Sequence, residues 1–248
     1  MKKIVLFLSI GVLFVLVAAG ASIAKNGYHD IDATGVKALM DKGEALVVFP
    51  LSPMEFDHKH IKGSVNILPA MMEYELPADK SKPLIFYCLG VKCVASWRAA
   101  EKAVELGYKN VYAFREGLPS WEKAGYPLES NSKIPDVEVM MISTDELSRL
   151  LDTEDVILLD INLDEDAKMF HINHAKRKHI PLDNLNISLP QLPKDKKIAV
   201  MCLKGKRSKT AARYLIGKGY MHVFVVEGGL QKWILEGRPI QQEVASNG

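Results

Sequence analysis

The sequence predicts an α/β protein with two domains in tandem, each a small, mainly parallel sheet with helices on both faces. Three observations predict this architecture: the chain repeats itself, each repeat alternates apolar runs with helical segments, and the length suits two domains. The 248 residues are 48% hydrophobic and 25% charged, which is enough to build two ordinary cores. The net charge of +2 lacks the basic excess of nucleic-acid-binding proteins, so no nucleic-acid partner is expected.

The repeat is clearest near the end of each half of the chain. The pattern G-Y-x-x-V followed by G-L-x-x-W-x-x-x-G-x-P begins at Gly107 and again at Gly219, 112 residues later. Eight identities in one register over 21 residues indicate a duplication. The predicted domains are 27–129 and 137–242, joined by a polar linker over 130–136 that contains a proline.

Each half alternates predicted strands with predicted helices. A helix is expected to begin after Ser143, which has capping-box spacing to Glu146, and another to run from Ser208 to Ile216. Strands that alternate with helices indicate a parallel sheet. Continuous apolar runs predict strands buried on both faces at 45–49, 84–87, 111–114, 156–159, 198–201 and 223–226.

The first residues have the composition of a leader. Lys2 and Lys3 precede an apolar run over residues 4–24 in which small residues follow the most hydrophobic part. Residues 1–24 are therefore predicted to be a secretory signal peptide, or an uncleaved anchor, because the run is just long enough to cross a bilayer of about 30 Å. In both cases the chain is expected to be exported, either periplasmic or attached through residues 4–24 to the outer face of the cytoplasmic membrane.

Two of the three cysteines follow equivalent predicted strands. Cys88 comes directly after the run 84–87, and Cys202 comes directly after the run 198–201. Ligands of open parallel sheets bind beyond the carboxyl ends of the strands. Both thiols are therefore expected at the mouth of such a crevice, each ahead of a helix.

The loop after Cys202 is rich in positive charge. Lys204, Lys206 and Arg207 lie within five residues of the thiol. Backbone N–H groups of a short loop and the dipole of the following helix add partial positive charge. Together these features favour an ionised, reactive thiolate with an anion held beside it.

The segment from Cys202 to Ser208, with an arginine five positions after the cysteine and then a serine, resembles the active-site loop of the rhodanese family. The repeated G-Y-x-x-V and G-L-x-x-W-x-x-x-G-x-P patterns are also similar to that family, and the resemblance covers residues 28–241. It implies two rhodanese-like domains and a sulfurtransferase without a metal or organic cofactor. Cys202 would take sulfane sulfur from a small anionic donor such as thiosulfate and pass it from a persulfide to a thiol or protein acceptor. The residues that would bind the donor are Leu203, Lys204, Gly205, Lys206, Arg207 and Ser208.

The loop after Cys88 departs from this pattern. Ser96 corresponds to Ser208, so this loop is two residues longer, and Cys93 stands five positions after Cys88, where the other loop has its arginine. Lys92 is the one cation in the loop and is the expected donor-binding group there. We expect Cys88 to be a second catalytic cysteine, with Cys93 either an incidental loop residue or a resolving thiol that closes a disulfide with it.

Other positions depart from the family as well. Asp160 matches an acidic residue that often follows an early strand, but Asn162 stands near the place of its usual arginine partner, and Phe49 replaces the acid in the first half. The basic stretch 176–179 is predicted to be a surface loop. His60, His171 and the two tryptophans of the repeat, Trp121 and Trp233, are predicted to be structural.

The sequence leaves two alternatives to the transferase. In one, the domains are a non-catalytic or redox module that binds polysulfide or a partner, with Cys88 and Cys93 cycling between dithiol and disulfide. In the other, the chain is a phosphatase, because a related family uses a similar fold with a longer cysteine loop. The first loop has no terminal arginine to stabilise a phosphoryl transition state, which disfavours that activity.

Overall fold

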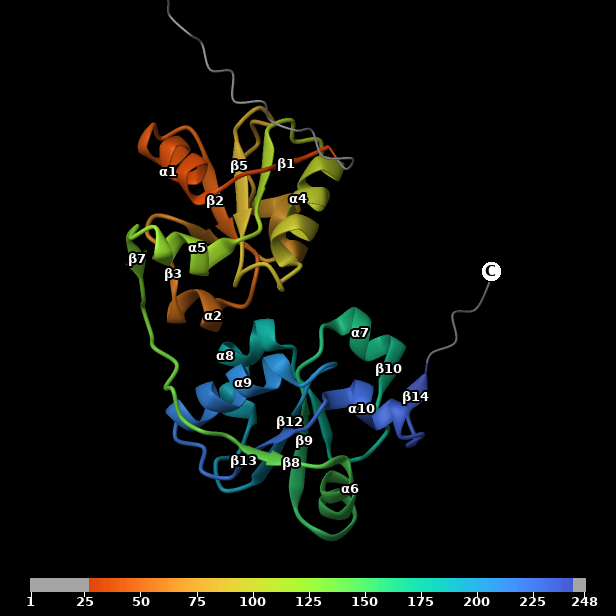
Figure 1. Cartoon of the computed structure of the whole chain (residues 1–248). Helices are drawn as coiled ribbons and strands as arrows, with labels where there is room; N and C mark the ends of the chain where they lie inside the picture. The colour runs from red at the N-terminus through yellow and green to blue at the C-terminus, as the bar shows by residue number, and fades with distance from the viewer. Residues whose placement is uncertain (1–26, 243–248) are drawn as a thin grey trace, which may run out of the picture.

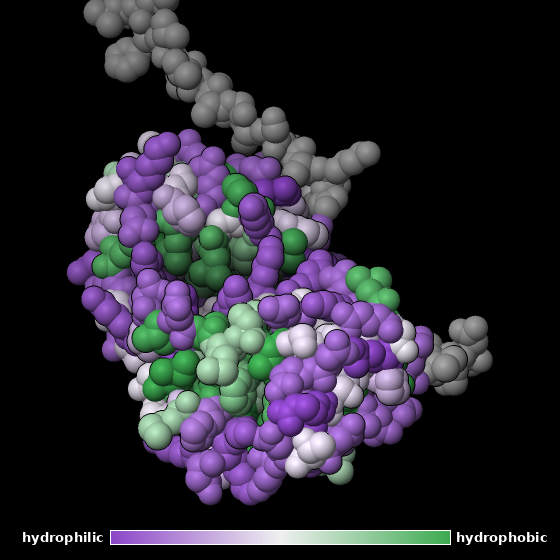
Figure 2. Space-filling model, turned by 60° about the horizontal axis from the view of Figure 1, so that its bottom comes forward, coloured by the Kyte–Doolittle hydropathy of each residue, from purple (hydrophilic) through white to green (hydrophobic). Residues whose placement is uncertain are grey.

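The computed structural model describes residues 27–242, which form an upper and a lower domain in Figure 1. The predicted leader over residues 1–24 lies outside the described residues. Within 27–242, no helix is both long enough and apolar enough to cross a membrane. Hydrophilic side chains predominate on the face drawn in Figure 2, and hydrophobic side chains gather there only in limited patches on the two domains.

The first domain is built on a five-stranded parallel sheet with strand order β1-β6-β5-β2-β4. A separate antiparallel pair, β3 with β7, joins the segment after α2 to the end of the domain. The strands are β1 (His29–Asp30), β2 (Leu46–Phe49), β3 (His60–Ile61), β4 (Val65–Asn66), β5 (Leu84–Tyr87), β6 (Val111–Phe114) and β7 (Leu128–Glu129).

Helices cover both faces of this sheet (Figure 1). One core cluster packs side chains of α1 and α5, such as Val36 and Trp121, against the sheet. The other packs α3 and α4, such as Met72 and Ala100, against the opposite face. The helical segments are α1 (Ala33–Asp41), α2 (Pro53–His58), η1 (Pro69–Met71), α3 (Met72–Glu75), α4 (Ala95–Glu105) and α5 (Gly117–Lys123).

The second domain repeats this topology. Its parallel sheet has the order β11-β9-β12-β13-β8, which is the first order read from the other end, and β10 pairs with β14 as β3 does with β7. The strands are β8 (Met140–Ile142), β9 (Val156–Asp160), β10 (Phe170–His171), β11 (Arg177–His179), β12 (Lys197–Met201), β13 (Val223–Val226) and β14 (Gln241–Gln242).

The helices of the second domain also lie on both faces of its sheet. Leu147 of α6 and Trp233 of α10 belong to one core cluster, whereas Leu185 of α8 and Leu215 of α9 belong to the other. The helical segments are α6 (Thr144–Thr153), α7 (Asp164–Met169), η2 (Leu182–Asn184), α8 (Leu185–Ser188), η3 (Leu189–Gln191), α9 (Lys206–Gly217) and α10 (Gly229–Leu235). The predicted fold class, two tandem domains with mainly parallel sheets and helices on both faces, is confirmed.

Equivalent side chains hold equivalent turns in the two domains. His60 Nδ1 lies 2.8 Å from the Phe56 carbonyl oxygen, and His171 Nδ1 lies 2.9 Å from that of Ala167. The two tryptophans of the repeat, Trp121 and Trp233, each donate from Nε1 to a proline carbonyl at 3.0 and 2.9 Å. The structural roles predicted for these residues fit their contacts.

The domains pack through α2 and the linker. Met54 of α2 and Ile134 of the linker are buried in a core cluster that otherwise belongs to the second domain. In Figure 1, α2 lies on the side of the first domain that faces α8 and α9. The carboxyl end of the first sheet, where β2 and β5 end, therefore points toward the second domain.

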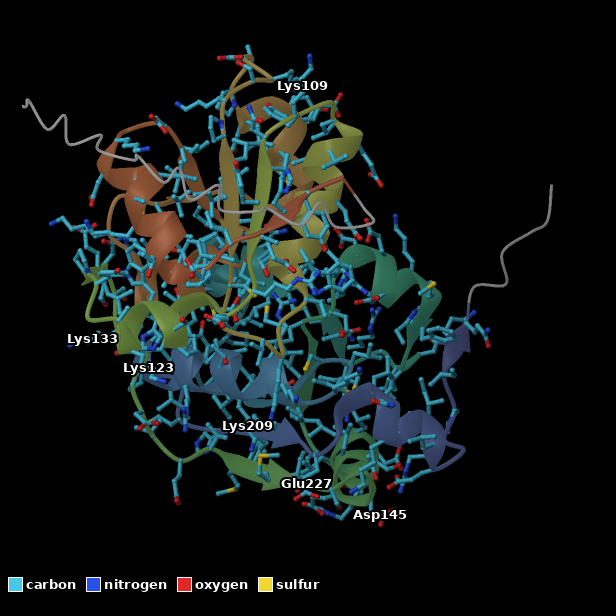
Figure 3. All side chains as sticks on the ribbon, turned by 45° about the horizontal axis from the view of Figure 1, so that its top comes forward. Lys109, Lys123, Lys133, Asp145, Lys209 and Glu227 are labelled. Carbon is cyan, nitrogen blue, oxygen red and sulfur yellow. The ribbon has the colours of Figure 1, made fainter. Side chains whose placement is uncertain are left out.

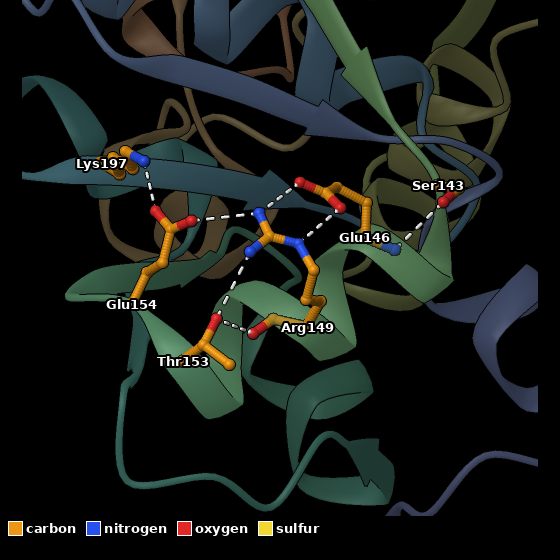
Figure 4. A network of polar contacts seen from close by, with 6 residues as sticks. All are labelled: Ser143, Glu146, Arg149, Thr153, Glu154 and Lys197. Atoms are coloured by element: carbon orange, nitrogen blue, oxygen red, sulfur yellow. Dashed lines mark hydrogen bonds and ion pairs between the residues drawn. The ribbon is translucent and has the colours of Figure 1, made fainter.

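A network of polar contacts lies at the amino ends of the strands of the second sheet (Figure 4). Arg149 contacts Glu146 at 2.8 Å and Glu154 at 3.0 Å, and Glu154 also pairs with Lys197, the first residue of β12. The capping box predicted for this helix forms only in part. Ser143 accepts from the N–H of Glu146, but the Glu146 carboxylate binds Arg149 instead of turning back to the cap.

The basic stretch 176–179 is not a surface loop, contrary to our prediction. Residues 177–179 form β11, the edge strand beside β9. Arg177 is paired with Asp160, a fully buried carboxylate, from Nη2 at 2.8 Å and from Nε at 2.9 Å. The charged residues in this stretch favour a loop when read alone, because the strand is short and the partner of Arg177 is 17 residues away.

Candidate active site

Both predicted thiols lie at the carboxyl end of an inner strand. Cys88 follows β5, which lies between β6 and β2, and Cys202 follows β12, which lies between β13 and β9. Each is followed by a loop and then a long helix on one face of its sheet. The two cysteines are therefore equivalent in the fold, as their sequence positions predict.

A glycine from the neighbouring loop holds each cysteine in place. The N–H of Leu118 donates to the Cys88 carbonyl oxygen at 3.0 Å, and the N–H of Leu230 donates to that of Cys202 at the same distance. The preceding residues, Gly117 and Gly229, have positive φ, and a Cβ on either would lie about 2 Å from that carbonyl oxygen. Only glycine permits so close an approach.

The Cys202 loop is short and turns directly into α9. Gly205, with φ of 75°, makes the turn, and the helix begins at Lys206. The N–H groups of the first turn have no partner within the helix, so they add to the positive potential at this end. Cys202 is buried, with 5% of the residue exposed, and Ser208 is fully buried.

The three cations that follow Cys202 have two different surroundings. Arg207 donates from Nη2 to Asp183 at 3.0 Å and lies 3.9 Å from Glu55 of α2, on the side of the first domain. Lys204 and Lys206 line a depression of about 470 Å³ together with Lys209 and Glu227, which Figure 3 labels. Cys202 is not among the residues that line this depression.

Two polar atoms of the loop are buried without a hydrogen-bond partner. They are Nε of Arg207 and Oγ of Ser208, both within six residues of Cys202. Burying a polar group without a partner is costly, and such groups are rare in folded proteins. Both can donate to a bound anion, so this pair is the strongest structural sign of a ligand beside the thiol.

The Cys88 loop has a different interior. Cys88 is fully buried, and its Sγ lies 3.4 Å from the carbonyl oxygen of Cys93 and 3.6 Å from the hydroxyl of Ser96. The N–H of Cys93 donates to the Gly90 carbonyl oxygen at 2.8 Å, which folds the extra residues into a turn. Lys92 is exposed at the tip of that turn.

The two thiols of this loop influence each other. A hydrogen bond from the Cys93 thiol, helped by Ser96 and backbone N–H groups and opposed by burial, lowers the pKa of Cys88 to about 6. The same hydrogen bond raises the pKa of Cys93, and burial adds to that effect. The hydrogen bond between the thiols therefore favours the ionised form of Cys88 and the protonated form of Cys93. Ionisation alone does not make Cys88 accessible, because its side chain has no exposed surface.

An interdomain cleft of about 520 Å³ opens beside the Cys88 loop. Leu89 of the loop lines it with Leu118 and Pro119, and Thr210 and Arg213 of α9 line it from the second domain. A molecule that reaches the first loop from this side therefore contacts both domains.

Three charged residues of the second site were missed by the predictions from sequence. Asp183 of η2 binds Arg207, Glu55 approaches it from the other domain, and Arg177 supplies the partner of Asp160 that Asn162 does not. Asn162 instead donates to Asp160 from its side chain at 2.9 Å. No local pattern marks these residues, because each reaches its partner across the fold.

Both halves of the chain are similar to known proteins. The model of the rhodanese-like domain matches residues 32–124 and again residues 143–236. A sulfurtransferase of Allochromatium vinosum is 36% identical over 100 residues, which are 40% of this chain and 92% of the relative. The thiosulfate sulfurtransferase GlpE of Pseudomonas savastanoi is 33% identical over 90 residues, which are 36% of this chain and 81% of the relative.

Solved structures with similarity to this chain include a rhodanese-related protein of Thermoplasma volcanium. It is 32% identical with a TM-score of 0.38, over 42% of this chain and 99% of that one. A thiosulfate sulfurtransferase of Pseudomonas aeruginosa is 20% identical with a TM-score of 0.41, over 86% of this chain and 43% of that one.

Proposed function

Because the chain belongs to the rhodanese-like domain family, we propose that it is a sulfurtransferase in which Cys202 carries sulfane sulfur as a persulfide. The relatives from Allochromatium vinosum and Pseudomonas savastanoi, which match about one domain's length, are named as sulfurtransferases, and this supports sulfur transfer in general. The observation that carries the assignment to Cys202 is the pair of unpartnered buried donors, on Arg207 and Ser208, in the loop that follows this thiol.

The first half of the reaction loads the cysteine. The Cys202 thiolate attacks the outer sulfur of thiosulfate, the S–S bond of the donor breaks, and sulfite leaves with the bonding electron pair. Charge is conserved, because a thiolate and a thiosulfate dianion become a persulfide anion, Cys–S–S⁻, and a sulfite dianion. The N–H groups at the start of α9, together with Arg207, hold the negative charge that develops on the donor.

The second half of the reaction unloads the cysteine. An acceptor thiolate, or cyanide in an assay, attacks the outer sulfur of the persulfide, and the Cys202 thiolate leaves. Because Cys202 is only 5% exposed, this step needs an acceptor slender enough to reach a buried thiol. No residue outside the loop needs to form a bond in either half.

The direct test is thiocyanate formation from thiosulfate and cyanide by the wild type, Cys202→Ser and Cys93→Ser. Transfer should disappear in Cys202→Ser and persist in Cys93→Ser, because only the first substitution removes the carrier. Mass spectrometry after thiosulfate treatment should find one added sulfur atom on the peptide of Cys202. An active Cys202→Ser protein, or added sulfur only on the peptide of Cys88, would contradict the assignment.

We further propose that the chain is exported through its first 24 residues, on the composition of that segment. Fractionation of producing cells, with the N-terminal sequence of the recovered protein, tests this. Recovery of the full-length chain from the cytoplasm would contradict it.

A further inference from the structure

The first domain holds two thiols in the place where the second domain has one thiol and an arginine. Cys93 and Arg207 each stand five residues after the cysteine that ends the strand. The extra turn from Gly90 to Cys93 folds back, so that the Cys93 carbonyl oxygen lies 3.4 Å from Cys88 Sγ. The Cys93 thiol is also close enough to lower the pKa of Cys88. A disulfide between them would join two residues of one loop whose backbone already turns back on the first sulfur.

The same loop is a poor site for a small, doubly charged donor. Lys92 is its one cation and is exposed, and the Cys93 carbonyl oxygen lies 3.4 Å from the sulfur. The neighbouring cleft combines apolar side chains, among them Leu89 and Leu118, with charged ones such as Lys59 and Arg213. These features suit the persulfide of an organic thiol better than thiosulfate.

We propose that the first domain is a persulfide-reducing site, in which Cys88 takes the outer sulfur from an organic persulfide and Cys93 then expels it as sulfide by forming a Cys88–Cys93 disulfide. This activity is separate from transfer by Cys202 and needs no residue of the second loop.

The steps balance without an external oxidant. In the first, the Cys88 thiolate attacks the outer sulfur of the persulfide R–S–SH, the S–S bond breaks, and R–S⁻ leaves, which gives Cys88–S–SH. In the second, Cys93 gives up its proton and attacks Sγ of Cys88, and HS⁻ leaves and takes up that proton. The persulfide sulfur is reduced to sulfide while two thiols are oxidised to a disulfide. A dithiol reductant then restores the pair for another cycle.

The electrostatics of the pair favour this order of events. Cys88, with its pKa lowered to about 6, is the thiolate that makes the first attack. The pKa of Cys93 is raised chiefly by its hydrogen bond to that thiolate. Once Cys88 carries the extra sulfur, its Sγ is no longer charged, and that cause is removed. Cys93 then loses its proton more readily and becomes the second nucleophile.

The test uses single-turnover reactions of the full chain with glutathione persulfide, without oxygen, in proteins that all carry Cys202→Ser. The parent protein should release one sulfide per chain and yield a Cys88–Cys93 disulfide on peptide mapping. Adding Cys93→Ser should abolish sulfide release and leave one extra sulfur atom on Cys88. Adding Cys88→Ser should abolish both the release and the loading.

Two outcomes would overturn the inference. One is sulfide release by the Cys93→Ser protein at the parental rate, and the other is that both thiols of the parent remain open to alkylation after the reaction. Cys93→Ala provides a second form of the variant if the serine distorts the turn. Because Cys202 is absent throughout, these results do not depend on whether the second domain transfers sulfur.

Discussion

At the level of single residues, the clearest difference between the two sites is the residue five positions after the cysteine. In the first domain it is Cys93, which lowers the pKa of Cys88, and in the second it is Arg207, whose Nε is buried without a partner, as is Oγ of Ser208. A thiolate is stabilised by whatever donates to it, and Cys93 is the largest of several causes that shift the pKa of Cys88. That dependence can be measured directly.

We expect Cys93→Ala to raise the apparent pKa of Cys88, because the substitution removes the largest cause of its lowered value. Cys93→Ser should raise it less, since a hydroxyl still donates to the thiolate. The measurement is the rate of alkylation of the Cys88 peptide as a function of pH in the full chain. In the wild type this rate should be constant well above about pH 6 and fall below it. Identical profiles for all three proteins would show that Cys93 does not control the thiolate.

The glycines beside the loops allow a second test at this level. Gly229→Ala would place a Cβ 2.0 Å from the Cys202 carbonyl oxygen at φ of 61°. Backbone strain and overpacking together should lower the free energy of unfolding by about 3 kcal/mol or more. They should also distort the loop, so thiocyanate formation should fall as well. Gly237→Ala is the matched control. It has φ of 70° and nothing near its Cβ, so it should cost only about 1–2 kcal/mol and spare activity. Equal losses of stability and activity in the two variants would contradict the role of this close approach.

At the level of elements, β9 and β11 are joined by a buried ion pair as well as by their ladder. Asp160 ends β9 with no exposed surface, and its carboxylate accepts from both Arg177 and Asn162. Arg177→Met would leave this carboxylate buried without its cation. Removing one partner of a buried pair costs about 3–5 kcal/mol, and we expect that loss in urea unfolding.

Arg149→Met is the control for this prediction. Arg149 also binds two carboxylates, but it lies in the exposed network of Figure 4, where water screens the charges. Arg149→Met should therefore lower the free energy of unfolding far less than Arg177→Met does. If the two variants unfold at the same urea concentration, burial does not decide the strength of the Asp160 pair.

The strands show which parts of the fold can be predicted from the sequence alone. The runs predicted at 84–87, 111–114 and 223–226 are β5, β6 and β13 with the same bounds, because an inner parallel strand is apolar along its whole length. The edge strand β11 has half-buried charged residues and no such run, so its sequence favours a loop. Short edge strands are defined by their neighbours, which local sequence does not contain.

The candidate site also has some features that sequence alone predicts and others that it does not. The repeat and the strand ends are enough to predict the positions of Cys88, Cys202 and Ser208. In the structure the two cysteines directly follow β5 and β12, and Ser208 lies in the first turn of α9. The side on which Arg207 points is not predictable, since Asp183 and Glu55 come from distant segments and one of them from the other domain. Contacts of that kind depend on how the chain folds back on itself.

At the level of the whole molecule, the domains are tied together through the end of α2. His58 Nδ1 accepts from the N–H of Ile134 in the linker at 3.0 Å, and the Asp57 carbonyl oxygen accepts from the N–H of Asn131 at 2.8 Å. Burial lowers the pKa of His58 from its ordinary value of 6.5, and the nearby cations Lys59 and Lys133 lower it further. Lys133, labelled in Figure 3, lies in the linker itself.

The protonation of His58 should therefore weaken the joint between the domains. The unfolded chain binds this proton more readily than the folded one, so stability falls as the pH drops below the ordinary value of 6.5. His58→Asn keeps an acceptor for the Ile134 N–H but does not titrate, so it should lose less stability than the wild type between about pH 7 and pH 5. Urea unfolding followed by tryptophan fluorescence at both pH values measures this difference, and the other titrating groups contribute equally to both proteins. The same loss in wild type and variant would mean that the His58–Ile134 hydrogen bond does not sense pH.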